Sequence, residues 1–325
     1  MRSEALFDLA AEREDVSLVA PPSVPLRESV ARLRRAGEQG SPGPGSIPGI
    51  ARAQWIESSA HGYSGEGARV SIAGKVWHLK RLRNSPDKEI DAIPRETRAR
   101  NEAGLAAVLR RDPQLSGSFS VPRQVSVFRD GREVFVLSEG LPSVGDGESK
   151  RWNLSPEQRA DASIIQLVLG LGDMHGGDVL PLAGGGFGLV DFEKLSRAPL
   201  EKATAQQIDT QVMLKEFPLV DRHSDNDLEV YRARFGRWKQ DYEDGGRERM
   251  DGALSGEGWS RPAREVYLAA VDRNLQTYFE RLTPYLDYAN DWHRRITASR
   301  AEAARRAQAP PRKSFLDGLF GRDSR

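Results

Sequence analysis

The residues between Leu167 and Leu195 concentrate the chemistry of this chain. The segment reads LVLGLGDMHGGDVLPLAGGGFGLVDFEKL and places Asp173 and Asp178 five positions apart, after an apolar helical pattern. A glycine-rich turn follows, and then a short apolar strand pattern that ends at Asp191. One carboxylate can orient a nucleophile while others hold Mg²⁺ against nucleotide phosphates, so this spacing suits phosphoryl transfer.

A lysine inside a strand pattern is a second candidate. In VWHLKRL, alternation places Val76, His78, Lys80 and Leu82 on one face, and only nine of the 48 basic residues are lysines. A lysine that faces a cleft is desolvated unless an anion meets it, such as nucleotide phosphates together with a helix glutamate. The alternative is a solvated strand lysine, and Lys75 is the weaker candidate for the same role.

The helical pattern RETRARNEAGLAAVLRR carries the acidic partner that such a lysine needs. We expect this helix to start at Pro94, because proline is favourable at a first helical position. Glu102 shares a face with Leu105 and Leu109, so it is expected to point inward. Glu96 faces away from them and is the second choice.

Glycines precede the lysine strand. HGYSGEGA is expected to form a loop in which Gly62, Gly65 and Gly67 let backbone amides approach phosphates. Glycine-rich loops are common, and only the position before the lysine strand connects this one with the candidate site.

The order of elements predicts a small sheet followed by a mainly helical half. We expect about five strands with one inserted helix after the linker, starting with a strand over 51–59. A hairpin turn is predicted at Ala73-Gly74 and another turn at 129–132. The run Ser155-Pro156-Glu157-Gln158 predicts a capping box at the start of the next helix. Later helices are expected over 205–214, 227–242 and 262–285.

These patterns divide the chain into four parts. Residues 1–50 are expected to be an N-terminal extension that ends in the linker GSPGPGSIPG, and residues 298–325 a flexible C-terminal tail. The body between them divides into an N-lobe over 51–142 and a C-lobe over 143–297. The acidic cluster of Asp221, His223, Asp225 and Asp227 lacks the spacing of a metal site and is expected to be a solvated loop.

Composition excludes several classes of function. The 48 basic and 47 acidic residues nearly cancel, so attraction to nucleic acid is not indicated. The absence of cysteine excludes disulfides and thiolate metal sites. No apolar run approaches a membrane span and the start lacks the pattern of a secretory signal, so we expect a cytoplasmic protein, with export independent of a signal peptide left open.

A sheet with a lysine, a helix with a glutamate and a helical half with two acidic loops resembles the protein-kinase-like fold superfamily. GLGDMHGGD and GLVDFE look most like the Asp-x-His-x-x-Asn and Asp-Phe-Gly segments of phosphoinositide 3-/4-kinase-like enzymes. They are also similar to the Asp-x-His-x-x-Asn and Asp-x-Glu segments in the dehydratase domain of class II lanthipeptide synthetases. The resemblance implies a two-lobed α+β fold with a small antiparallel-sheet N-lobe, one helix in it, and a mainly helical C-lobe.

The resemblance also implies roles in the acidic loops. Asp173 would be the catalytic carboxylate, and His175 would brace its loop or contact phosphate. Asp178 occupies the family's asparagine position and would bind Mg²⁺ together with Asp191, the principal metal ligand. Glu193 replaces the usual glycine and is either a third acidic ligand or a surface residue.

In the N-lobe the resemblance implies a nucleotide site. Lys80, with Glu102 as its partner, would hold the phosphates under the loop at 62–67, and the strand and hinge over 136–141 would bring Glu139 near adenine. The expected function is an ATP- and Mg²⁺-dependent phosphotransferase that moves the γ-phosphoryl group to a hydroxyl of a protein, lipid or small molecule. The alternatives are a nucleotide-binding pseudokinase or scaffold, since Asp178 departs from the pattern, and an enzyme with another product, such as nucleotidyl transfer. The terminal extensions leave a protein partner open.

Overall fold

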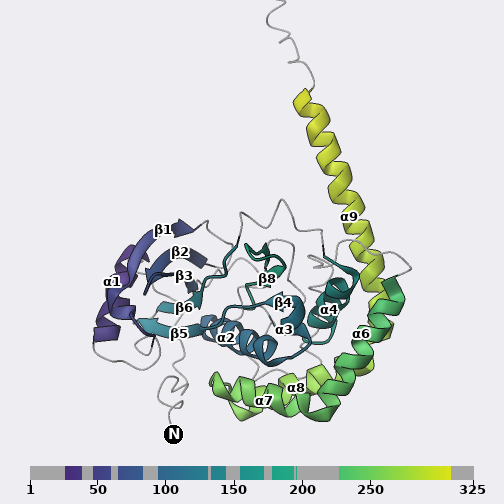
Figure 1. Cartoon of the computed structure of the whole chain (residues 1–325), viewed down its shortest axis with the longest axis horizontal. Helices are drawn as coiled ribbons and strands as arrows, with labels where there is room; N and C mark the ends of the chain where they lie inside the picture. The colour runs from purple at the N-terminus through teal and green to yellow at the C-terminus, as the bar shows by residue number, and fades with distance from the viewer. Residues whose placement is uncertain are drawn as a thin grey trace, which may run out of the picture.

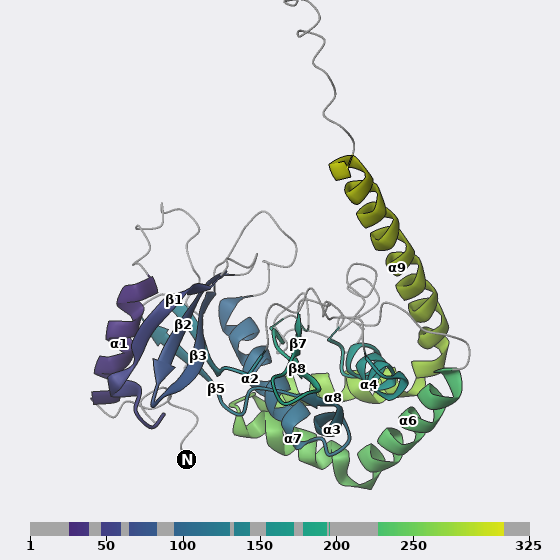
Figure 2. The same cartoon turned by 45° about the horizontal axis from the view of Figure 1, so that its top comes forward.

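The computed structural model describes nine parts of the chain: residues 26–38, 47–59, 65–82, 94–130, 133–143, 154–171, 178–193, 195 and 227–308. Figures 1 and 2 show two lobes. One lobe contains a sheet with the helices that pack against it, and the other is a mainly helical body.

The larger sheet has five antiparallel strands in the order β1-β2-β3-β6-β5. They are β1 (Gln54–Ser59), β2 (Gly65–Ile72), β3 (Lys75–Leu82), β5 (Val125–Asp130) and β6 (Glu133–Glu139). The predicted Ala73-Gly74 turn is confirmed, and both residues have positive φ (51° and 77°), as a tight hairpin requires. β1 starts later than predicted because residues Ile50–Arg52 form a 3₁₀ turn.

Each face of this sheet packs against a helix. α1 (Leu26–Glu38) covers one face, where Val70, Trp77 and Leu79 are buried with α1 residues in one core (Figure 1). α2 (Arg95–Arg111) covers the other, where Leu82 and Val136 join the main core. Alternation along β3 produces these two faces. Residues 26–38, which we expected to belong to an extension, therefore help to form the core of the sheet lobe.

The second lobe is mainly helical. Its helices are α3 (Leu115–Ser118), α4 (Pro156–Leu167), α6 (Leu228–Asp241), α7 (Arg247–Gly256), α8 (Arg261–Gln276) and α9 (Tyr278–Gln308). A small sheet, β4-β8-β7, joins Phe119–Ser120, Phe187–Leu189 and Val179–Pro181. The predicted capping box of α4 is confirmed: Ser155 accepts the backbone N–H of Gln158, whose side chain accepts the N–H of Ser155.

The three later helices predicted from the sequence have different outcomes. The pattern over 227–242 corresponds to α6, whereas the one over 262–285 is divided at Thr277 between α8 and α9. The helix expected over 205–214 lies outside the described residues. α7, which was not predicted, follows a π-helical turn over Tyr242–Gly246 in which Gly245 has a φ of 103°.

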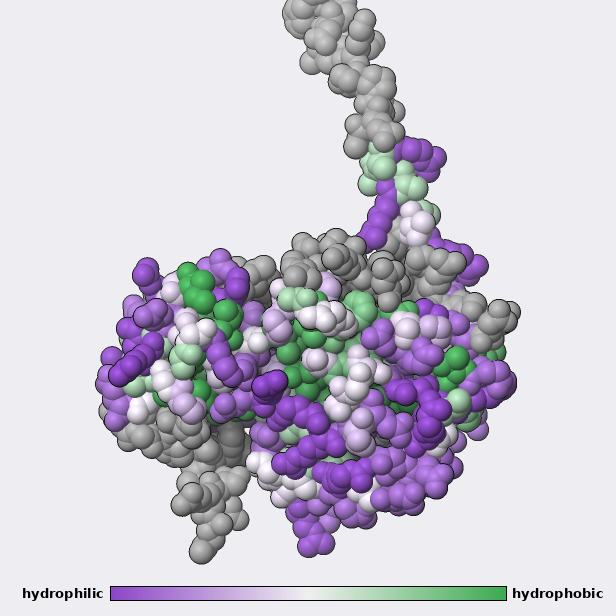
Figure 3. Space-filling model, viewed as in Figure 1, coloured by the Kyte–Doolittle hydropathy of each residue, from purple (hydrophilic) through white to green (hydrophobic). Residues whose placement is uncertain are grey.

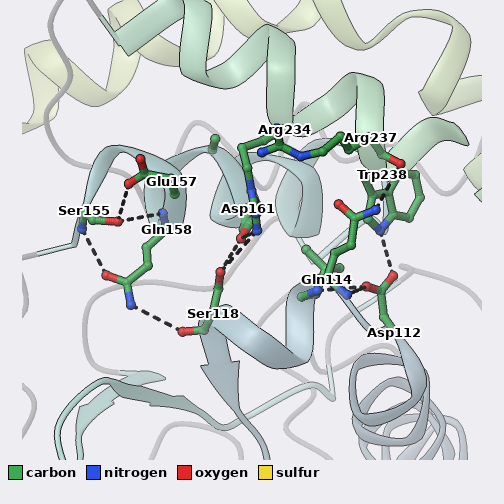
Figure 4. Close-up of polar contacts among 12 residues, drawn as sticks. Asp112, Gln114, Ser118, Ser155, Glu157, Gln158, Asp161, Arg234, Arg237 and Trp238 are labelled. Atoms are coloured by element: carbon green, nitrogen blue, oxygen red, sulfur yellow. Dashed lines mark hydrogen bonds and ion pairs between the residues drawn. The ribbon is translucent and has the colours of Figure 1, made fainter. Parts of the chain in front are cut away.

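A buried carboxylate joins α3, α4 and α6 (Figure 4). Oδ1 of Asp161 in α4 accepts a hydrogen bond from Nε of Arg234 in α6 at 2.9 Å. The other carboxylate oxygen accepts from Ser118 at the end of α3 and from Nη2 of Arg234. The side chain of Asp161 is only 2% exposed, so its charge depends on these partners.

α9 projects away from the helical lobe (Figures 1 and 2). Its outer turns are exposed and carry ion pairs such as Arg306 with Glu302. None of the described helices is both long and apolar enough to cross a membrane. On the face drawn in Figure 3, apolar residues gather near the middle of the molecule, with smaller groups elsewhere, and hydrophilic residues cover much of the rest.

The predicted fold class is confirmed. The chain has an α+β structure with a small antiparallel sheet, a helix inserted between β3 and β5, and a mainly helical second lobe. This is the expected two-lobed arrangement, and the strands β7 and β8 follow α4 along the chain.

Candidate active site

The lysine of β3 meets two carboxylates from the loop that follows β8. Nζ of Lys80 lies 2.9 Å from Oδ1 of Asp191 and 3.2 Å from Oε2 of Glu193. Lys80 belongs to the sheet lobe, and Asp191 follows it by 111 residues. The structure therefore brings together two charged groups that the sequence keeps far apart.

β3 holds Lys80 on the face of the sheet that carries α2. The strand pairs on both sides, and Lys80 lies opposite Gly67 of β2 and Val136 of β6. Directly paired residues share a face, so the position beside Lys80 on β2 carries no side chain. Gly65 and Gly67 are thus residues of β2, and the prediction that they lie in a loop is wrong, because both pair with β3. Gly62 lies outside the described residues.

The backbone at Asp191 has an uncommon conformation. Its φ is 68°, in the left-handed region that a non-glycine residue seldom adopts. The residue comes two positions after β8 ends at Leu189, which pairs with Val179 in β7. A strained residue persists only where its surroundings hold it, and such residues cluster at functional sites. The loop therefore holds Asp191 in an uncommon backbone conformation beside Lys80.

Three side chains of α2 hold the loop after Asp191. The N–H of Phe192 donates to Oε2 of Glu102 at 2.6 Å. Nδ2 of Asn101 donates to the carbonyl oxygen of Glu193 at 2.9 Å. Nη1 of Arg98 lies 3.8 Å from Oε1 of the same glutamate. The helix therefore fixes both the backbone and the buried charge of this loop.

Glu102 points inward, but its contact differs from the one we expected. Its carboxylate binds the backbone N–H of Phe192, whereas the ion pairs of Lys80 within the described residues are with Asp191 and Glu193. Glu96, the second choice, pairs with the exposed Arg129 at the surface. Glu102 therefore acts on Lys80 through the loop that carries Asp191 and Glu193.

Crowded charges shift the pKa values of this site. Burial opposes the charged form of Lys80, but the carboxylates of Asp191, Glu193 and Glu102 raise its pKa above the usual value. Burial, and then the charge of Asp191, raise the pKa of Glu102 to about 8, against the opposing effect of Lys80. At neutral pH the lysine is therefore charged and Glu102 is mostly protonated.

The carboxylates near the β7–β8 hairpin differ in how accessible they are to a metal ion. Asp191 keeps 38% of its side chain exposed, whereas Glu193 keeps 1%. The backbone of the buried Asp178 lies beside the same loop, since its carbonyl accepts the N–H of Val190 at 3.1 Å. Among the residues that the structure describes, no group of three acidic or histidine side chains is arranged to hold a metal ion, so the expected three-carboxylate group is not found. Mg²⁺ commonly takes one or two carboxylates plus phosphates and water, so the donor chemistry of Asp191 and Asp178 fits this ion.

Within the described residues, the structure joins none of the remaining predicted residues to Lys80. Asp173 and His175 lie outside the described residues. Glu139 ends β6, and its Oε1 lies 2.6 Å from Nζ of Lys75, so its carboxylate is engaged at the end of the sheet. Asp227, from the acidic cluster, pairs with Arg159 at 2.6 Å, which is a contact between helices of the second lobe.

The sequence did not predict the two buried polar residues of α2 that contact Glu193. Arg98 and Asn101 are buried in α2. The sequence does not indicate these contacts, because the partner of both residues, Glu193, lies more than ninety residues away in the loop after β8.

No family model matches this chain, and no curated protein matches it either. Among solved structures, the chain is similar to the crystal structure of CtkA, a Helicobacter pylori proinflammatory kinase. The two sequences are 10% identical, the match covers 73% of this chain and 97% of that chain, and the TM-score is 0.44.

Proposed function

We propose that this chain is an ATP- and Mg²⁺-dependent phosphotransferase. The ion pair between Lys80 and Asp191 is the observation that carries the proposal, because it joins a cation of the sheet lobe to a carboxylate of the helical lobe at 2.9 Å. A nucleotide between the lobes needs both charges: an ammonium for its phosphates and a carboxylate for the metal that accompanies them.

Different residues bind the nucleotide and orient the acceptor. Lys80 binds phosphate oxygens, and Gly67 opposite it leaves room for them on the sheet. Asp191 and Asp178 would hold Mg²⁺, which neutralises charge on the phosphates when it is bound. Asp173 orients the acceptor hydroxyl and accepts its proton. Transfer then depends on position and charge, and no covalent intermediate on the protein is needed.

The test is transfer of label from γ-labelled ATP by the purified full chain. The chain is incubated with Mg²⁺ and with acceptors of the three classes: proteins of a host lysate, lipid vesicles and small-molecule extracts. Asp191→Asn and Asp173→Asn should lower transfer by at least about 100-fold. Asp287→Asn changes an exposed aspartate of α9 and should leave the rate unchanged. Wild-type transfer rates in either site variant would refute the assignment.

A nucleotide-binding module without efficient transfer is the second candidate. The observation in its favour is Asp178, a buried carboxylate at the position where the resembling enzymes carry asparagine. It adds negative charge beside the nucleotide phosphates. Stabilisation by ATP and Mg²⁺ in a thermal unfolding experiment, with no label transferred to any acceptor, would favour this module over the enzyme. Should label from α-phosphate rather than γ-phosphate appear on an acceptor, the reaction is nucleotidyl transfer.

A further inference from the structure

The two carboxylates that contact Lys80 differ in their access to solvent. Asp191 and Glu193 are separated by one residue, and their side chains are 38% and 1% exposed. Both lie within 3.2 Å of the same ammonium group. A metal–nucleotide complex would approach from the open side, so it would meet Asp191 first and could not reach Glu193 without displacing protein.

We infer that Glu193 is the positioning residue for Lys80: it holds the lysine when Asp191 turns to a metal–nucleotide complex. The inference rests on the proposed function and refines it. It also replaces the expectation that Glu193 is either a third metal ligand or a surface residue.

The contacts of Glu193 keep it in place. Its carbonyl oxygen accepts from Asn101, and Arg98 lies 3.8 Å from its carboxylate on the buried side. Moving this carboxylate to a metal would leave Arg98 and Lys80 with less negative charge around them. Removing one partner from a buried ion pair is costly, so the carboxylate stays.

Glu102 does not perform this task in the structure. Its carboxylate accepts the N–H of Phe192 at 2.6 Å, and the ion pairs of Lys80 in the described chain are with Asp191 and Glu193. When Asp191 binds a metal, the lysine keeps a direct carboxylate partner only through Glu193. The loop after β8 therefore carries the metal ligand and the lysine partner, and α2 holds that loop.

Nucleotide binding with and without Mg²⁺ distinguishes a lysine partner from a metal ligand. ATP affinity is measured by calorimetry for wild type, Glu193→Gln and Asp191→Asn, with the exposed Glu280→Gln as control. With Mg²⁺ present, Glu193→Gln should weaken ATP binding about tenfold, because Lys80 then loses its remaining carboxylate partner, and it should cause no further loss in a Lys80→Met background. Asp191→Asn should lose the gain from Mg²⁺. If Glu193→Gln weakens binding with Mg²⁺ equally in the Lys80→Met background, Glu193 is a metal ligand and the inference is overturned.

A second measurement needs no nucleotide. Melting temperatures are compared for Lys80→Met, Glu193→Gln and the double variant. Because the two residues are partners, the loss caused by Glu193→Gln should be smaller by about 3 °C or more in the Lys80→Met background. Additive shifts would overturn the inference. If wild type binds no nucleotide, the proposed function fails, and this cycle still decides whether Glu193 and Lys80 are partners.

Discussion

Phe192 donates its backbone N–H to Glu102 at 2.6 Å, which ties the loop after β8 to a helix 90 residues earlier in the chain. The neighbouring residue, Asp191, has a φ of 68°, and the next residue in the loop, Glu193, is bound to Asn101 of the same helix. The position of α2 therefore sets where the two carboxylates meet Lys80.

The first prediction concerns the pH dependence of stability. The pKa of Glu102 is about 8 in the folded chain, against 4.5 as its ordinary value. Between these values the folded state keeps a proton that the unfolded state has released, so the free energy of unfolding falls as the pH rises. Glu102→Gln resembles the protonated acid and does not titrate. Relative to this variant, wild type should lose more than about 1 kcal/mol between pH 5 and pH 9 in urea denaturation. An equal pH dependence of wild type and Glu102→Gln would contradict this prediction.

The second prediction compares two lysines of β3. Lys80→Met should lower ATP turnover by about 100-fold, because the cation that binds phosphate is lost. Lys75→Met removes an exposed lysine whose partner is Glu139 at the end of the sheet, and turnover should stay within about twofold. Steady-state kinetics with saturating Mg²⁺ give both rates. Equal losses in the two variants would contradict the role of Lys80.

The third prediction concerns the backbone of Asp191. Alanine keeps the cost of a left-handed conformation, whereas glycine removes it. Asp191→Gly should therefore be more stable than Asp191→Ala by about 0.5–1 kcal/mol, although neither variant should show metal-dependent turnover. Chemical denaturation of the two proteins measures the difference. Equal stability would mean that this residue is not strained in the folded chain.

The fourth prediction tests the contact between α4 and α6 (Figure 4). Arg234→Met leaves the charge of Asp161, which is 2% exposed, without its main partner. The free energy of unfolding should fall by about 3 kcal/mol. Arg232→Met in the same helix breaks an exposed ion pair with Glu229 and should cost less than about 1 kcal/mol. Similar losses in both variants would show that burial does not determine the value of these pairs.

Local patterns predicted several elements closely. The helix expected from Pro94 is α2, over Arg95–Arg111, and the capping box at Ser155 starts α4. Helix caps and strand alternation depend on neighbours in sequence, so they can be recognised without the fold. The role of α1 was missed because its apolar face is explained only by the sheet that it covers.

For the candidate site, the sequence by itself determined which groups are present: a lysine on one face of β3, an inward glutamate on α2 and a carboxylate after β8. Only the tertiary structure decided how they pair. Lys80 contacts Asp191 and Glu193, while Glu102 binds the backbone of their loop. The physical reason is that these partners lie about ninety or more residues apart, so their distances depend on how α2 and the sheet pack against the second lobe.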